Sequence, residues 1–143
     1  MNFLIIEDEE QAAKRLKRMV SKLIPEAFIH GPCESIAEAV EWFEENPKPD
    51  LAFFDIHLAD GLSFEIGEKT DVECPIIFTT AFDQYAIRAF KLNSVDYLLK
   101  PITEENLSAA LEKFKSHFLQ HPVKVFGREW PEQIRSDYEN KYK

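Results

Sequence analysis

The segment Leu51-Ala52-Phe53-Phe54-Asp55 sets four apolar residues directly before a carboxylate. A short apolar run of this kind is typical of a strand that is buried on both faces of a parallel sheet. Comparable runs occur at residues 3–6, 75–78 and 95–99, and a weaker one at residues 27–29. Because these five runs alternate with longer stretches of helical periodicity, we predict an α/β protein with a doubly wound parallel sheet.

The stretches between the runs carry apolar residues at helical spacing. Residues 9–24 place Ala13 and Leu16 on one face of a helix. Ser35 followed by Glu38 is a capping box, which predicts the start of a second helix. We predict the other helices at residues 62–69, at residues 83–91, and from Thr103 to about residue 118, with Leu107, Leu111, Phe114 and Phe118 buried.

Length and charge limit the possible functions. The chain has 143 residues, and 17 basic against 26 acidic side chains give a net charge of −9. We predict one domain at residues 1–118 and a linker at residues 119–143. Nucleic acids are bound mainly through basic side chains, so this acidic domain is not expected to grip DNA by itself. Two cysteines, no apolar run of membrane-spanning length and no signal peptide predict a cytoplasmic protein.

Polar side chains stand where the predicted strands end. Glu7 and Asp8 follow the first strand, Asp55 follows the third, and Thr80 and Lys100 follow the fourth and fifth. Ligands of open parallel sheets bind in the crevice outside these carboxyl ends. If the first and third strands are neighbours, Asp8 and Asp55 start about 5 Å apart, and a cation is needed to offset their repulsion. Carboxylates without His or Cys partners suit Mg²⁺.

The motifs around these side chains resemble a known family. They are Glu7-Asp8-Glu9, Phe54-Asp55-Ile56-His57-Leu58-Ala59-Asp60-Gly61, Thr79-Thr80-Ala81 and Asp96-Tyr97-Leu98-Leu99-Lys100-Pro101. In this order and spacing they are similar to the receiver domain of bacterial two-component response regulators. Residues 60–65, 80–86 and 92–97 resemble more narrowly the LytR/AlgR group, whose output is a LytTR DNA-binding domain. The resemblance covers about residues 1–118 and implies a flavodoxin-like (βα)5 fold with strand order 2-1-3-4-5.

Asp55 is the phosphoacceptor that the resemblance implies, with a sensor histidine kinase as the phosphodonor. It implies that Mg²⁺ is held by the carboxylates of Asp8 and Asp55 and by the backbone carbonyl of His57. Glu7 would act on the metal directly or through water. Such a domain is not a conventional enzyme, because it catalyses only its own phosphorylation and a slow autodephosphorylation.

Lys100 and Thr80 would complete the reacting site. Lys100 would pair with one phosphoryl oxygen, and the Thr80 hydroxyl would donate to another. The bond between Lys100 and Pro101 is expected to be cis. Inward movement of the Thr80 hydroxyl would let the Tyr97 ring turn in, which changes the surface of the fourth helix, fifth strand and fifth helix.

This changed surface is expected to form a homodimer. The predicted contact residues are Tyr85, Arg88, Lys91, Asp96 and Lys113. The aromatic, mixed-charge linker resembles the one that precedes a LytTR domain. We therefore expect a C-terminal DNA-binding domain past Lys143, and no contact with a membrane.

Three positions depart from the usual receiver pattern. Ala59 stands where many receivers have Pro. Glu7 replaces an Asp found in many receivers, and its longer side chain decides whether it contacts the metal directly or through water. Phe82 is apolar at a position that influences water access in this family, so we predict slow hydrolysis of the phosphoaspartate.

The sequence lacks the motifs of two other classes of α/β protein. A haloacid-dehalogenase-like phosphatase would carry a second Asp where this chain has His57. A dinucleotide-binding domain would show Gly-x-Gly-x-x-Gly after the first strand, and this chain does not. The alternative that stays open is a receiver-shaped interaction module that is never phosphorylated, because only chemistry distinguishes the two.

Overall fold

The computed structural model describes residues 1–81 and 94–118. These residues contain a five-stranded parallel sheet in the order β2-β1-β3-β6-β7. Its strands are β1 (Asn2–Ile6), β2 (Phe28–Cys33), β3 (Leu51–Asp55), β6 (Ile76–Thr80) and β7 (Asp96–Leu99). This is the predicted order 2-1-3-4-5, so the predicted fold class is confirmed.

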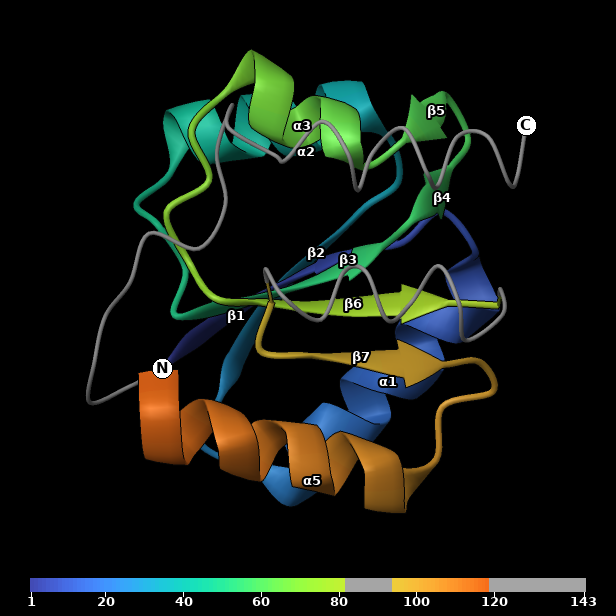
Figure 1. The fold of residues 1–143 in the computed structure, drawn as a ribbon, viewed down its shortest axis with the longest axis vertical. Helices are drawn as coiled ribbons and strands as arrows, with labels where there is room; N and C mark the ends of the chain where they lie inside the picture. Colours follow the sequence, from blue (N-terminus) through green and yellow to red (C-terminus); the bar gives the residue numbers. More distant parts are fainter. Residues whose placement is uncertain (82–93, 119–143) are drawn as a thin grey trace.

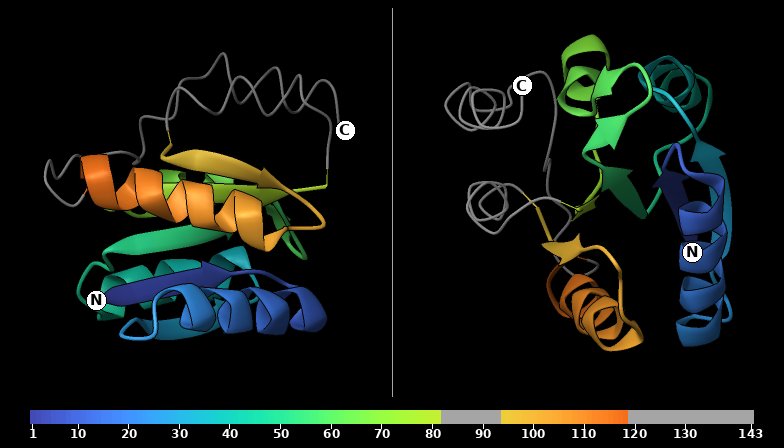
Figure 2. Two further views of the ribbon diagram at one scale, coloured as in Figure 1. Left: turned by 90° about the horizontal axis from the view of Figure 1, so that it is seen from below. Right: turned by 90° about the vertical axis from the view of Figure 1, so that its right-hand side faces the viewer.

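Helices cover both faces of the sheet (Figure 1). One face carries α2 (Ile36–Glu45) and α3 (Phe64–Lys69), and the other carries α1 (Glu10–Leu23) and α5 (Glu104–Lys113). Figure 2 shows the sheet as the middle of three layers. None of the helices in the described part is long and apolar enough to cross a membrane. The predicted helix at residues 83–91 lies outside the described residues.

Successive residues of a central strand supply two separate cores. In β3, Ala52 and Phe54 pack in the core under α2 and α3, whereas Leu51 and Phe53 pack in the core under α1 and α5. All four side chains are buried. A strand that feeds both cores must be apolar at every position, which explains the unbroken apolar run in the sequence.

Side-chain caps begin two of the helices where the sequence predicts them. Ser35 Oγ accepts a hydrogen bond from the backbone N–H of Glu38 at 3.1 Å, which starts α2. Thr103 Oγ1 does the same for Asn106 at 3.1 Å and starts α5. After Lys113 the chain continues as one π-helical turn, η2 (Phe114–Phe118).

Strand β2 is longer than predicted. It reaches Cys33 instead of stopping at residue 29, although it contains Gly31 and Pro32. An edge strand tolerates Pro because one side of it has no ladder to complete. Gly31 has φ of 95°, and a Cβ there would lie 2.5 Å from the carbonyl oxygen of Ile5, so the close approach to β1 requires glycine.

A short hairpin after β3 was not predicted. Strands β4 (His57–Leu58) and β5 (Gly61–Leu62) pair antiparallel. The hairpin is closed by a hydrogen bond from the N–H of Ser63 to the carbonyl of Ile56 at 2.9 Å. Because β5 uses residue 62, helix α3 begins at Phe64 rather than at residue 62.

The two cysteines are free thiols in the core. Cys33 and Cys74 are both buried beneath α2 and α3. Burial raises the pKa of the Cys33 thiol to about 12. Burial also raises the pKa of the Cys74 thiol. Both side chains therefore act as small apolar residues at neutral pH.

Candidate functional site

The carboxyl ends of the strands bring the predicted site residues to one edge of the sheet. Glu7 and Asp8 follow β1, Asp55 ends β3, Thr80 ends β6 and Lys100 follows β7. Strand β6 continues two residues further than predicted, so Thr80 is its last residue rather than a loop residue. The backbone N–H of Lys100 donates to the carbonyl of Thr80 at 2.8 Å, which fixes the two strand ends together.

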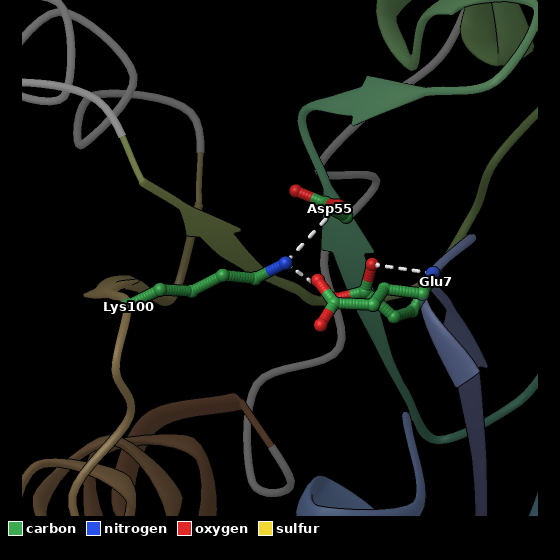
Figure 3. A network of polar contacts seen from close by, with 4 residues as sticks. Glu7, Asp55 and Lys100 are labelled. Carbon is green, nitrogen blue, oxygen red and sulfur yellow. Dashed lines mark hydrogen bonds and ion pairs between the residues drawn. The ribbon is translucent and has the colours of Figure 1, made fainter. Parts of the chain in front are cut away.

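Lys100 joins two acidic side chains (Figure 3). Its Nζ lies 2.6 Å from Glu7 Oε1 and 3.2 Å from Asp55 Oδ2. The other oxygen of Glu7, Oε2, accepts the backbone N–H of Glu9 at 3.2 Å. Both carboxylate oxygens of Glu7 are therefore engaged, and Lys100 is closer to Glu7 than to Asp55.

Burial makes the charged forms of the acids unfavourable. Glu7 is 4% exposed and Asp55 is 7% exposed, while Asp8 is partly exposed. Burial raises the pKa of Glu7, and its hydrogen bond with Asp55 adds to this. Burial likewise raises the pKa of Asp8 and of Asp55, although hydrogen bonding with Glu7 and the charge of Lys100 oppose the rise at Asp55. A further cation near these acids would favour their ionised forms.

Lys100 responds to this environment in the opposite way. Burial lowers its pKa, but the hydrogen bond to Glu7 and the charge of Asp55 outweigh burial, so the net pKa of Lys100 is raised. The side chain therefore stays an ammonium at neutral pH. It is a fixed positive charge beside Asp55.

The acidic side chains fit a divalent metal ion. Glu7, Asp8 and Asp55 each offer a carboxylate oxygen, and these oxygens lie within 4.8 Å of one another. Oxygen ligands of this kind suit Mg²⁺, which takes one or two protein carboxylates and keeps several waters. His57 lies two residues after Asp55 in β4, and burial lowers the pKa of its ring. The site therefore has the donor chemistry that the sequence predicts for magnesium.

Thr80 and Tyr97 lie in neighbouring strands. Thr80 is 1% exposed at the end of β6. Tyr97 of β7 is half-buried and packs against the core under α2 and α3. The bond between Lys100 and Pro101 is cis, as expected.

A cavity of about 470 Å³ adjoins the acidic site. Glu7 and Lys100 line it together with Leu16 and Met19 of α1 and Ile102. It was not predicted from the sequence, because its walls come from elements far apart in the chain. A reactant would find room there beside the Lys100 ammonium.

The predicted dimer residues fall into two groups. Tyr85, Arg88 and Lys91 lie outside the described residues, as does Phe82. The other two contact each other within the chain, with Lys113 Nζ 3.5 Å from Asp96 Oδ2.

Asp60 was not predicted to have a role of its own. Both of its carboxylate oxygens face the first N–H groups of α2, 2.8 Å from Ile36 and 3.4 Å from Ala37. The sequence signal for it is weak, since Asp60-Gly61 indicates only a turn.

Comparison with known proteins gives consistent matches. The model of the response regulator receiver domain family matches residues 3–112. The sensory transduction protein LytT of Enterococcus faecalis is 41% identical over 116 residues, which are 79% of this chain and 47% of that protein. The positive alginate biosynthesis regulatory protein of Pseudomonas aeruginosa is 37% identical over 117 residues, covering 79% of this chain and 46% of that protein. This chain thus spans about half the length of the curated relatives it matches.

A solved structure agrees with these matches. The response regulatory domain of protein mrkE from Klebsiella pneumoniae has a TM-score of 0.70 and 28% identity. The alignment covers 85% of this chain and all of that domain. The likeness therefore extends over most of the chain.

Proposed function

This chain belongs to the family of response regulator receiver domains of two-component systems, and on that premise we propose that Asp55 is the residue that becomes phosphorylated. The observation that carries the proposal is the position of Lys100 Nζ, 3.2 Å from Asp55 Oδ2, in a cluster with Glu7 and Asp8. A buried carboxylate nucleophile beside a fixed ammonium and a divalent-cation site has the parts that phosphoryl transfer needs.

In the proposed reaction, an oxygen of Asp55 attacks the phosphorus of a phosphohistidine on a sensor kinase. The new P–O bond forms as the P–N bond breaks, and the imidazole nitrogen keeps the electron pair of the broken bond. Lys100 follows the developing charge onto a phosphoryl oxygen, and the Thr80 hydroxyl donates to another. Since the transition state is loose, alignment and charge stabilisation supply most of the rate.

Asp8 and Asp55 would hold Mg²⁺ through their carboxylates, and His57 would hold it through its backbone carbonyl. Glu7 would act directly or through water. When bound, the ion supplies positive charge that offsets both the acids and the phosphoryl oxygens. Among the described residues, the ammonium paired with Glu7 and Asp55 is that of Lys100.

Thr80 and Tyr97 would transmit the change. The Thr80 hydroxyl moves toward the phosphoryl group, and the Tyr97 ring turns into the space it leaves, which biases a two-state surface. The ion pair between Asp96 and Lys113 must open if these side chains are to bridge two copies in a phosphorylated homodimer.

The proposal extends to the organisation of the whole protein. Residues 1–118 would form the receiver domain and residues 119–143 the linker to a LytTR DNA-binding domain, so DNA is reached only through that domain. We expect the protein to act in the cytoplasm, where a histidine kinase can reach Asp55. Phe82 would slow hydrolysis of the phosphoaspartate, and Phe82→Glu should shorten its lifetime.

Treatment with acetyl phosphate and Mg²⁺ tests the proposed function. Intact-mass measurement should find one added phosphoryl group on the wild-type chain and none on Asp55→Asn. Asp50→Asn, which changes an exposed carboxylate outside the site, is the matched control and should be modified like the wild type. An unmodified wild-type chain would favour the alternative, an interaction module of receiver shape.

A further inference from the structure

The carboxylate of Asp60 links two elements that are distant in the sequence. Asp60 lies in the turn of the β4–β5 hairpin, and its Oδ1 accepts the N–H of Ile36 at 2.8 Å, 24 residues away. Its Oδ2 lies 3.4 Å from the N–H of Ala37. The first N–H groups of a helix have no partner within the helix, and a negative charge is favourable there. The contact therefore holds the hairpin against the start of α2.

Helix α2 already has a cap of its own. Ser35 Oγ accepts the N–H of Glu38 at 3.1 Å. Because this local cap begins the helix, the distant carboxylate of Asp60 is not needed to start it. Its effect falls instead on the hairpin, whose strands β4 and β5 pair with each other at two positions.

The hairpin and the helix also pack closely. Gly61 has φ of 142°, and a Cβ built there would lie 3.2 Å from Cδ1 of Ile36. The backbone at Gly61 thus lies close to the Ile36 side chain, next to the hydrogen bond from Ile36 to Asp60. The hairpin therefore lies directly against the start of α2.

Backbone hydrogen bonds connect this contact to two segments of the acidic site, the loop carrying Glu7 and Asp8 and the hairpin that follows Asp55. On one side, the N–H of Glu7 donates to the carbonyl of Cys33 at 2.9 Å, and Cys33 lies three residues before Ile36. On the other side, the carbonyl of Ile56, next to Asp55, accepts the N–H of Ser63 at 2.9 Å and closes the hairpin. A closed ring of contacts therefore joins the two loops through the start of α2.

We propose that Asp60 is a positioning residue that sets the distance between the loop carrying Glu7 and Asp8 and the hairpin carrying His57. The inference rests on the proposed function, because the carbonyl of His57 matters only if the site binds a metal ion. Groups that orient metal ligands typically change metal affinity 10- to 100-fold when they are removed. Loss of Asp60 therefore weakens Mg²⁺ binding without removing a ligand.

Three variants of the 143-residue chain test the proposal. Asp60→Ala removes both acceptors, whereas Asp60→Asn keeps an oxygen for the N–H of Ile36 but removes the charge. Ser35→Ala removes the other cap of α2, the hydrogen bond that Ser35 Oγ accepts from the N–H of Glu38. Mg²⁺ affinity is measured by calorimetry, folding by thermal unfolding, and hairpin opening by hydrogen–deuterium exchange of residues 57–62 in metal-free protein.

Asp60→Ala should raise the Mg²⁺ dissociation constant about 10-fold and speed exchange in residues 57–62. Asp60→Asn should stay within about 3-fold of the wild type, because geometry rather than charge is at stake. Ser35→Ala should lower the unfolding temperature and leave both other readouts unchanged. The proposal is overturned if Asp60→Ala binds Mg²⁺ with wild-type affinity, or if Ser35→Ala loses as much Mg²⁺ affinity as Asp60→Ala. If the wild type binds no Mg²⁺, the proposed function fails, and the exchange rates still report on the link.

Discussion

The two sides of the acidic site are held in different ways. On the side of β1 and β3, Glu7 and the hairpin after Asp55 are fixed by backbone hydrogen bonds and by Asp60, contacts that do not depend on the state of the site. On the side of β6 and β7, the Lys100 side chain is held by ion pairs that reach across to Glu7 and Asp55. The acidic side is therefore held by backbone hydrogen bonds and by Asp60, whereas the Lys100 ammonium is held by side-chain ion pairs.

The largest expected effect comes from removing the cation. Lys100→Met should slow phosphorylation by acetyl phosphate about 100-fold, which is typical of losing one donor that stabilises transition-state charge. Mg²⁺ should bind more tightly, because its competitor for Glu7 and Asp55 is gone. Time-resolved intact mass and calorimetry measure the two effects.

Lys22→Met is the matched control for this loss of charge. Lys22 makes an exposed ion pair with Glu104 at 3.1 Å, and neither residue belongs to the acidic site. It should phosphorylate at the wild-type rate. A Lys100→Met chain within about 3-fold of wild type would show that Lys100 does not contact the phosphoryl group.

A second test strains the junction of β2 with β1, the strand that leads to Glu7 and Asp8. Gly31→Ala should lower the free energy of unfolding by about 2 kcal/mol or more, because the new Cβ meets the backbone oxygen of Ile5 at φ of 95°. Gly61→Ala meets the movable end of the Glu65 side chain instead and should cost less. Urea denaturation measures both, and equal losses would contradict a rigid junction of β2 with β1.

A third test uses pH. The folded chain keeps protons on Glu7, Asp8 and Asp55 that the unfolded chain releases, because burial raises each pKa. Their contribution to stability is therefore complete below the ordinary pKa values of about 4 and is lost as pH rises through the higher folded values. Without metal, the free energy of unfolding should fall over this window, and saturating Mg²⁺ should reduce the fall.

Glu7→Gln sharpens the pH experiment, since it removes one of the buried titrating groups. Urea denaturation in the presence of a chelator should then show a flatter pH dependence than in the wild type. The exposed Glu41 gives a control, Glu41→Gln. If both variants follow the wild-type curve, the buried acids do not set the slope.

The smallest effect concerns Ser63 beside the hairpin. Its side chain is fully buried, and its Oγ has no hydrogen-bond partner among the described residues. Ser63→Ala keeps the backbone bond to Ile56 and removes a buried hydroxyl, so it should stabilise the chain by up to about 1 kcal/mol. A loss of stability in urea denaturation would mean that the hydroxyl is satisfied.

The central strands and the site residues could be predicted because their signals are local. The apolar run before Asp55 indicates a strand that supplies two cores, and the parallel sheet then brings Glu7, Asp8 and Lys100 to the same edge. The capping pair of Ser35 and Glu38 is likewise a short pattern. These features need no knowledge of which distant segments meet.

The features that were missed depend on tertiary contacts. Strand β2 lies at the edge of the sheet and, among the described strands, pairs only with β1. Most of its residues are at least partly exposed, so its apolar pattern is weak. The role of Asp60 depends on a helix start 24 residues away. The β4–β5 hairpin is too short to show an alternating pattern.

The buried thiols make this chain well suited to fluorescent labelling. With the pKa of Cys33 at about 12 and Cys74 fully enclosed, neither sulfur should react with a maleimide dye while the chain is folded. A cysteine placed at the exposed position Ala109 of α5 would be the single dye attachment point. The natural residues need no replacement before energy-transfer or spin-label measurements that test the proposed dimer.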